Sequence, residues 1–266
     1  MRNGVIYRPV EPVKPAAGYI GGKKQLAQTI IRCIEQIPHE TYAEPFVGMG
    51  GVFLRRRRAQ KGEVINDRSG DVATFFRILQ RHYVPFMDML RWQLTSRADF
   101  ERLKATSPAV LTDMERAARF LYLQRTAFGG KVAGRNFGVD AAGGRFNVAK
   151  LEGVLDALHD RIAGVTIECL PWAEFIRRYD RPGTLFYLDP PYYGGETDYG
   201  EGLFERAEYG RMAEVLRGIK GRFILSINDV APIRKAFEGF SMRKVQLTYT
   251  LSGSKPQRAR ELIIRQ

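Results

Sequence analysis

The chain has 266 residues, 44% of them hydrophobic, and it carries 42 Lys and Arg against 29 Asp and Glu, a formal charge of +13. This length suits one α/β domain, alone or with a sizeable insertion. The basic excess favours a polyanionic partner, with nucleic acid as the leading candidate. Because no apolar stretch is long enough for a signal peptide or a membrane span, we expect a cytoplasmic protein.

The cysteines and histidines argue against a metal site and against a disulfide framework. The sequence contains two cysteines, Cys33 and Cys169, and three histidines, without close metal-ligand spacing. Cys33 lies in an amphipathic helical pattern and Cys169 in a β-type run. We therefore predict that both thiols are buried in the core, and we expect no metal.

The first elements read as strands and helices around a glycine loop. Residues 18–24 form a glycine turn that feeds a helix with apolar positions at Leu26, Ile30, Ile31 and Ile34. Residues 42–54 then predict a strand, a glycine loop and a second helix. A short strand at residues 63–65 ends on Asn66 and Asp67, so this stretch predicts a βαβ unit of the nucleotide-binding kind.

The middle of the chain is mainly helical, from Asp71 to about Ala163, with its clearest amphipathic helix at residues 114–128. Residues 131–147 are rich in Gly, Arg and Asn and predict a basic loop or hairpin. Strands and helices alternate again from residue 165. Two closing β-rich runs, at residues 244–250 and 261–264, predict a terminal hairpin.

One apolar run, residues 184–188, ends abruptly at Asp189-Pro190-Pro191-Tyr192. The prolines have no N–H group and a fixed φ, so the strand must stop at Asp189. Ligands of open α/β sheets bind at this carboxyl end of the strands. A carboxylate, released carbonyls and an aromatic ring there suit a planar base with an amino group; the alternative is a strand followed by a rigid turn, with Tyr192 as a hydrophobic plug.

The loop at Gly48-Met49-Gly50-Gly51 lacks both the dinucleotide spacing and the Gly-Lys-Ser/Thr ending of a phosphate-binding loop. Asp67, about 20 residues further on, can hold ribose hydroxyls, although a cap or turn role is the plainer interpretation. A ribose-containing ligand without pyrophosphate fits S-adenosylmethionine. Its sulfonium needs no metal or nucleophilic side chain for methyl transfer.

These motifs resemble the Dam-like family of adenine-specific DNA methyltransferases. The resemblance is carried by Tyr19-Ile20-Gly21-Gly22-Lys23, then Glu44-Pro45-Phe46-Val47-Gly48-Met49-Gly50, then Asp189-Pro190-Pro191-Tyr192, in that order, and it extends over nearly the whole chain. It implies a Rossmann-like α/β sheet with helices on both faces and a terminal β-hairpin. The catalytic domain would comprise residues 1–74 and 164–266, and residues 75–163 would form an inserted, mainly helical DNA-recognition subdomain.

The resemblance also implies roles for individual residues. The catalytic set would be Asp189, Pro190, Pro191 and Tyr192, with the Pro190 carbonyl accepting from the adenine amino group and Tyr192 stacking on the extruded base. The cofactor S-adenosyl-L-methionine would be bound by Tyr19, Lys23, Phe46, Gly48, Gly50, Asp67 and Asp189. Relatives carry Asn where this chain has Gln124, and a second Asn where it has Gly129 or Gly130.

Basic residues and one asparagine are the candidates for contacts with double-stranded DNA. They are Arg125, Lys131, Arg135, Asn136 and Arg145 in the middle of the chain, with Lys255 and Arg258 near the terminal hairpin. In contrast, residues 55–58, four consecutive arginines, predict a solvated helix end, because successive helical residues circle the axis. Trp92 and Trp172 lie in apolar surroundings and predict core positions.

We therefore expect a monomeric enzyme that methylates the 6-amino group of adenine in DNA. Two alternatives remain open: methylation of RNA or of a protein glutamine, for which relatives more usually carry Asn at the position of Asp189, and a basic DNA-binding relative that has lost turnover. Host protection, anti-restriction and regulation all use this chemistry, and the recognition sequence depends on side chains that the pattern does not place.

Overall fold

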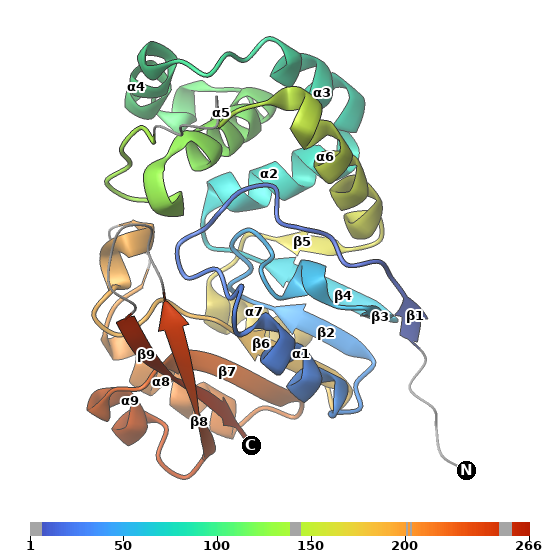
Figure 1. Ribbon diagram of the computed structural model, residues 1–266. Helices are drawn as coiled ribbons and strands as arrows, with labels where there is room; N and C mark the ends of the chain where they lie inside the picture. Colours follow the sequence, from blue (N-terminus) through green and yellow to red (C-terminus); the bar gives the residue numbers. More distant parts are fainter. Residues whose placement is uncertain (1–6, 139–144, 201, 203, 250–256) are drawn as a thin grey trace.

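A computed structural model describes residues 7–138, 145–200, 202, 204–249 and 257–266, and its centre is a seven-stranded sheet (Figure 1). The strand order is β5-β4-β2-β6-β7-β9-β8. The strands are β2 (Thr41–Glu44), β4 (Gly62–Asn66), β5 (Thr166–Glu168), β6 (Thr184–Leu188), β7 (Arg222–Asn228), β8 (Ser241–Tyr249) and β9 (Gln257–Arg265). In this order, the neighbours from β5 through β4, β2 and β6 to β7 pair in parallel. β9 is antiparallel to β7, and β8 is antiparallel to β9. The predicted terminal hairpin is confirmed.

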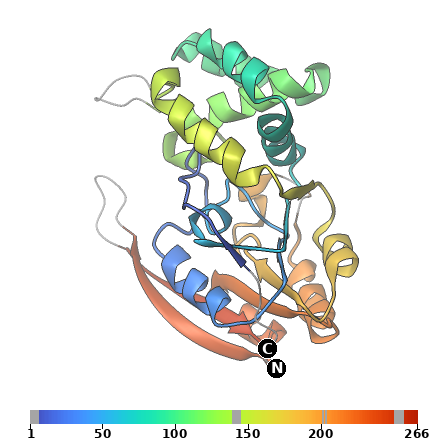
Figure 2. The same cartoon turned by 90° about the vertical axis from the view of Figure 1, so that its right-hand side faces the viewer.

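Helices cover both faces of this sheet because its central strands are apolar on both sides. In β6, Leu185 and Tyr187 belong to one core cluster, whereas Phe186 and Leu188 belong to the other. Helix α1 (Ala27–Glu35) packs in the first cluster, and α7 (Trp172–Tyr179), α8 (Ala207–Arg217) and α9 (Ala231–Ala236) pack in the second. Figure 2 shows α1 and α7 on opposite sides of the sheet. The predicted α/β class with helices on both faces is confirmed.

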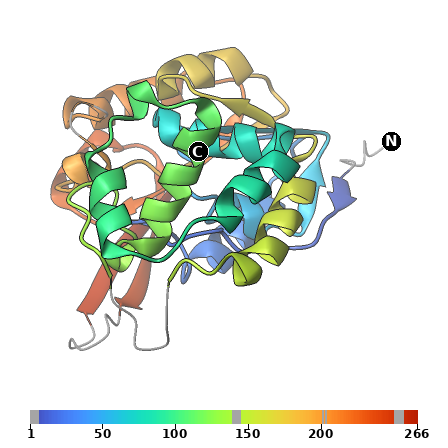
Figure 3. The same cartoon turned by 90° about the horizontal axis from the view of Figure 1, so that it is seen from above.

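A group of helices lies above the sheet (Figures 1 and 3). It contains α2 (Gly70–Arg81), α3 (Tyr83–Arg91), α4 (Arg97–Ala105), α5 (Asp113–Thr126) and α6 (Val148–Ile162). The central helix α5 begins with a capping box, in which Thr112 and Glu115 satisfy each other's backbone N–H groups. It packs against α2, α3 and α4 through buried residues such as Phe120 and Leu121. The mainly helical middle segment is confirmed.

The connection from β2 to β4 corrects one prediction. After the glycine loop the chain forms a short 3₁₀ helix, η1 (Phe53–Arg55), and a strand, β3 (Arg58–Gln60), instead of an α-helix. β3 pairs with β1 (Tyr7–Pro9) in a separate two-stranded sheet. The parallel pairing of β2 with β4 is as predicted. The connection between them has no α-helix, so it is not the predicted βαβ crossover.

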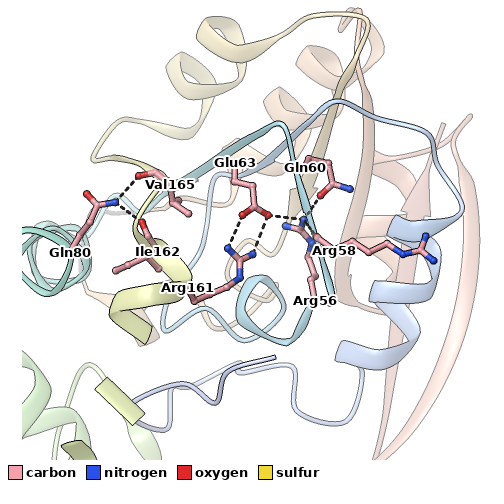
Figure 4. Close-up of polar contacts among 8 residues, drawn as sticks. All are labelled: Arg56, Arg58, Gln60, Glu63, Gln80, Arg161, Ile162 and Val165. Carbon is pink, nitrogen blue, oxygen red and sulfur yellow. Dashed lines mark hydrogen bonds and ion pairs between the residues drawn. The ribbon is translucent and has the colours of Figure 1, made fainter. Parts of the chain in front are cut away.

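The arginine run is also not a solvated helix end. η1 ends at Arg55, and Arg56 is only 2% exposed. Its guanidinium donates to Glu63 Oε1 at 2.8 Å and to the side chain of Gln60, while Arg161 of α6 binds both oxygens of Glu63 at 2.7 and 3.0 Å (Figure 4). Arg56 also stacks on the Tyr42 ring, 3.7 Å from its centroid. We name Arg56, Glu63 and Arg161 the structural charge cluster; it joins β4 to the helical group.

Two of the predicted core residues are in fact exposed. Trp92, the residue after α3, is 85% exposed, and Cys169, the residue after β5, is exposed as well, because neither position belongs to the regular element whose pattern predicted its burial. Cys33 and Trp172 are buried as predicted. None of the helices in the described ranges is long and apolar enough to cross a membrane.

Candidate active site

A cavity of about 300 Å³ lies at the carboxyl ends of β2, β4 and β6, a volume typical of small-molecule sites. The strand order changes direction between β2 and β6, which opens a crevice at that edge. Six of the seven predicted cofactor residues line the cavity: Tyr19, Lys23, Phe46, Gly48, Asp67 and Asp189. Pro191 lines it as well, whereas Gly50, Pro190 and Tyr192 do not belong to its lining.

The glycine loop after β2 has a backbone that only glycine adopts easily. Gly48 has a φ of +51°, and a Cβ atom there would lie 2.9 Å from the ring of Tyr19. The backbone N–H of Gly48 donates to Asp67 Oδ2 at 2.9 Å, and that of Ser69 donates to Oδ1 at 2.9 Å. Asp67 therefore fixes the loop, which is the cap or turn role, and it also lines the cavity. Burial raises its pKa to about 6, although the two N–H donors oppose this effect.

Lys23 and Asp189 meet at the floor of the same cavity. The Lys23 ammonium lies 2.7 Å from Asp189 Oδ1, donates to the Tyr192 hydroxyl at 2.8 Å and lies 4.4 Å from the Tyr192 ring centroid. Glu261 of β9 is 4.0 Å from the same ammonium. Lys23, expected at the cofactor carboxylate, is thus also the counter-ion of Asp189.

The two oxygens of the Asp189 carboxylate have different surroundings. Lys23 contacts Oδ1, and the Ser226 hydroxyl donates to Oδ1 at 3.2 Å. Within the described ranges no side chain or backbone group bonds to Oδ2, and the Asp189 side chain is 19% exposed, at the cavity. Burial raises the pKa of Asp189 to about 6, while Lys23 opposes this increase. At neutral pH the carboxylate is therefore ionised and keeps one oxygen for a ligand.

The segment after Asp189 is held by the ends of neighbouring elements. The side chain of Asn228, at the end of β7, donates to the Tyr193 carbonyl and accepts from the Tyr193 N–H, at 3.0 and 2.9 Å. The Tyr209 hydroxyl of α8 donates to the Pro191 carbonyl at 3.0 Å. These bonds give the Pro-Pro-Tyr segment a defined path out of the sheet.

The sequence reasoning missed Glu44, Ser226 and the site position of Glu261. Glu44 ends β2, is 2% exposed and lines the cavity, and it accepts from the Tyr42 hydroxyl at 2.7 Å. Burial raises the pKa of Glu44 to about 8. An acidic residue at the end of a buried strand, directly before a proline, was a usable signal for Glu44. Ser226 and Glu261 are fully buried in β7 and β9, and no local pattern marks them.

The predicted DNA contacts divide into engaged and exposed side chains. Arg125 donates to the carbonyls of Ala16 and Arg145, both at 3.1 Å. Arg145 donates to the Ala127 carbonyl, and Arg135 bonds to Gln124. Lys131 and Asn136 are exposed. Lys255 lies outside the described residues, and of Arg258 only the backbone, in β9, is described.

Gln124 and Gly130 connect the middle loop to the segment that carries Tyr19 and Lys23 at the cavity. The Gln124 amide donates to the carbonyls of Gly18 and Gly130 at 2.8 and 2.6 Å, and the Ile20 N–H donates to Gly130 at 3.1 Å. A Cβ atom on Gly130 would lie 2.9 Å from the Gly18 backbone. This loop therefore packs directly on the segment that carries Tyr19 and Lys23.

The donor set of the cavity fits an adenosyl ligand with a positive centre. Tyr19 and Phe46 offer aromatic surfaces for a purine, and Asp67 offers a carboxylate to ribose hydroxyls. Asp189 places an ionised oxygen where a sulfonium and an amino group could both approach.

Comparison with known proteins shows the family of this chain. Residues 19–251 match the family model of the D12 class N6 adenine-specific DNA methyltransferases. The chain is similar to the type II methyltransferase M.CviBI of Paramecium bursaria Chlorella virus NC1A, with 24% identity over 89% of this chain and 91% of that protein. It is also similar to the DNA adenine methylase of Salmonella typhi, with 24% identity over 89% and 88%, and to the DNA N-6-adenine-methyltransferase of Escherichia phage P1, with 27% identity over 87% of this chain and 33% of that protein. The chain belongs to the D12 class of N6 adenine-specific DNA methyltransferases.

Proposed function

We propose that this enzyme transfers the methyl group of S-adenosyl-L-methionine to the 6-amino group of an adenine extruded from double-stranded DNA, using the cavity at the ends of β2, β4 and β6. The observation that carries this proposal is the meeting of Asp189, the glycine loop and Asp67 around one cavity. Asp189 lies more than a hundred positions after the glycine loop and Asp67 in the chain. In addition, the open Oδ2 of Asp189 supplies an acceptor for an amino group.

Asp189 and the Pro190 carbonyl act on the adenine. The amino nitrogen of adenine is a weak nucleophile because its lone pair is delocalised into the ring. When Asp189 Oδ2 and the Pro190 carbonyl accept its two hydrogens, the nitrogen can become tetrahedral and its lone pair is freed for attack. Tyr192 provides a ring on which the extruded base stacks, and Pro191 fixes the direction of this segment.

The cofactor site comprises Tyr19, Lys23, Phe46, Gly48, Gly50, Asp67 and Asp189. Bound there, S-adenosylmethionine supplies a methyl group that its sulfonium charge already activates. Asp67 holds the ribose, and Gly48 and Gly50 let the backbone approach the ligand closely. Lys23 has two tasks in this proposal: it attracts the cofactor carboxylate, and it keeps Asp189 ionised by its positive charge.

DNA is held by basic side chains around the cavity and by the helical group, which we assign to recognition as residues 75–163. The exposed Lys131 and Asn136 are the foremost contacts with the duplex. Arg125, Arg135 and Arg145 shape the loop that carries them through their bonds to Ala16, Gln124 and Ala127, and we propose that their positive charge attracts the DNA backbone. Lys255 and Arg258 would approach from the terminal hairpin. We propose that one molecule acts alone on each site.

Nucleoside mass spectrometry of DNA incubated with the protein and S-adenosylmethionine tests this function. We expect N6-methyladenine. Parallel reactions with RNA and with a glutamine-containing protein are expected to give no product. Cofactor binding without methyladenine in DNA would contradict the proposal, and a product only in RNA or protein would favour the alternative substrates. Sequencing the methylated DNA at single-base resolution then gives the recognition sequence.

A further inference from the structure

A chain of hydroxyl groups connects the core of the sheet to Asp189. Ser226 follows Leu225 in β7 just as Asp189 follows Leu188 in β6, and Leu188 and Leu225 are paired in the parallel ladder. The Ser226 hydroxyl is 3.2 Å from Asp189 Oδ1 and 2.8 Å from the Tyr187 hydroxyl. Tyr187 and Ser226 are both fully buried. Tyr187 lies in β6 two residues before Asp189, which directly follows the strand, so their side chains share one face of the sheet.

The carboxylate fixes the direction of these hydrogen bonds. An ionised Asp189 can only accept, so Ser226 must donate its single proton to Oδ1. The Ser226 oxygen is then left as an acceptor, and Tyr187 donates to it. Burial and the nearby Asp189 raise the pKa of Tyr187 well above its ordinary value, so the phenol keeps the proton that this arrangement needs.

The result is that two donors hold Oδ1. Lys23 approaches Oδ1 from the segment before α1, and Ser226 approaches it from β7. With Oδ1 held from both sides, rotation of the carboxylate about its last bond is restricted, and Oδ2 stays directed to the cavity. A carboxylate held by Lys23 alone could exchange its two oxygens, because a lysine ammonium is a flexible point charge.

We propose that Ser226 and Tyr187 are positioning residues, which fix the Asp189 carboxylate by Oδ1 so that Oδ2 receives the amino group of the substrate. This inference deepens the proposed function and rests on it for the identity of that amino group. Neither residue touches the substrate; both act through Asp189.

Loss of the Ser226 donor should also change the ionisation of Asp189. Among the described residues, the ionisable groups that face Asp189 are Lys23, Glu261 of β9, Glu44 of β2 and Tyr187. Lys23 and Ser226 lower the pKa of Asp189, whereas Glu261 raises it. Removing Ser226 takes away one stabilising donor, so the pKa of Asp189 should increase.

The test compares Ser226→Ala, Tyr187→Phe and a matched control, Thr184→Val. Thr184 is a buried hydroxyl residue at the opposite end of β6, where it donates to the Tyr179 carbonyl. We expect kcat to fall about tenfold in Ser226→Ala, as for loss of a hydrogen bond to a charged group, and about threefold in Tyr187→Phe. The KM for S-adenosylmethionine should stay within about twofold, and Thr184→Val should keep the wild-type kcat. The acid limb of the kcat profile should move to higher pH in Ser226→Ala.

A second readout separates this inference from the proposed function. Carbon-13 NMR of labelled aspartate carboxyl groups, with the Asp189 signal identified by Asp189→Asn, follows its ionisation in the protein without DNA. A higher pKa in Ser226→Ala supports the inference even if wild-type protein methylates no DNA, an outcome that would contradict only the proposed function. An unchanged kcat profile together with an unchanged Asp189 titration overturns it. An equal loss of kcat in Thr184→Val overturns it too, because the effect would then reflect general damage to the sheet.

Discussion

The structural charge cluster and the candidate active site, both in the described part of the chain, differ in how many oxygens of their carboxylates are bonded. In the structural charge cluster, Arg56 and Arg161 together occupy both oxygens of Glu63. In the candidate active site, the donors to Asp189 all contact Oδ1. Glu63 therefore joins two elements, whereas Asp189 keeps an open oxygen beside a cavity, where a ligand can bind. Burial of charge alone does not distinguish these two carboxylates.

The largest expected effect comes from Asp189→Ala, which removes the open acceptor. We predict a loss of methylation of about 10³-fold or more, because the amino group loses its charged partner in the transition state. DNA retention in a filter-binding assay should fall much less. An equal loss of methylation and DNA binding would instead assign Asp189 a structural role, and the comparison with Glu63 would no longer hold.

The opposite result is expected for Glu63→Gln, which should damage stability and leave chemistry intact. Removing this anion leaves Arg56 and Arg161 buried without their charge partner, and we predict a loss of about 3–5 kcal/mol in the free energy of unfolding. Urea unfolding measures this loss. Asp88→Asn, which breaks the exposed pair with Arg91, is the control and should cost less than about 1 kcal/mol. A fall in kcat per folded molecule in Glu63→Gln would contradict the separation of the two clusters.

Methylation activity should also depend on pH, because the open oxygen of Asp189 belongs to a titrating carboxyl group. Asp189 has a pKa raised to about 6 by burial, and only its ionised form can accept both from Lys23 and from an amino group. Activity should therefore be full above this pKa and should fall as pH decreases through it, by about tenfold per pH unit at lower pH. Steady-state kcat at saturating DNA and cofactor, between pH 4.5 and 8, measures this limb. A flat profile across pH 6 would show that ionisation of Asp189 does not limit the reaction.

The smallest effect is expected at the surface, with Lys131→Ala. The exposed ammonium of Lys131 is a candidate phosphate contact, so its loss should weaken DNA binding a few-fold and reduce the slope of log affinity against log salt by about 1. Wild-type affinity itself should fall steeply with added salt. Lys220→Ala is the matched control, since Lys220 is exposed two residues before β7, at the opposite edge of the sheet from the cavity. Equal effects of the two changes would remove Lys131 from the interface.

Much of this architecture was predictable because its signals are local. The apolar run before Asp189-Pro190-Pro191-Tyr192 predicts a strand that must end there, and β6 does end at Leu188. Glycines at positions 48 and 50 predict a loop of unusual backbone, which their positive φ values confirm. The α1 and α5 periodicities, the terminal hairpin and the family were likewise accessible, because propensity, periodicity and motif order are properties of short segments.

Three of the errors concern burial. Arg56, Trp92 and Cys169 were assigned to the surface or to the core from their neighbours in the sequence, and each lies on the other side of that boundary. Whether Arg56 is buried depends on Glu63 and Arg161, and Arg161 is about a hundred positions away. The partner that stabilises a buried charge is brought to it by the tertiary structure, so a short segment of sequence does not reveal it.

By itself, the sequence determined the order of the motifs, the places where strands must end and the basic character that suits DNA, because these follow from residue chemistry and short-range geometry. Only the tertiary structure decided which carboxylates are open and which are saturated. Ser226 and Glu261 reach Asp189 and Lys23 because β7 and β9 lie beside β6 in the sheet order. Distances of a few ångströms between side chains so far apart in the chain arise from strand pairing and packing, and these distances fix which oxygen of Asp189 faces the cavity.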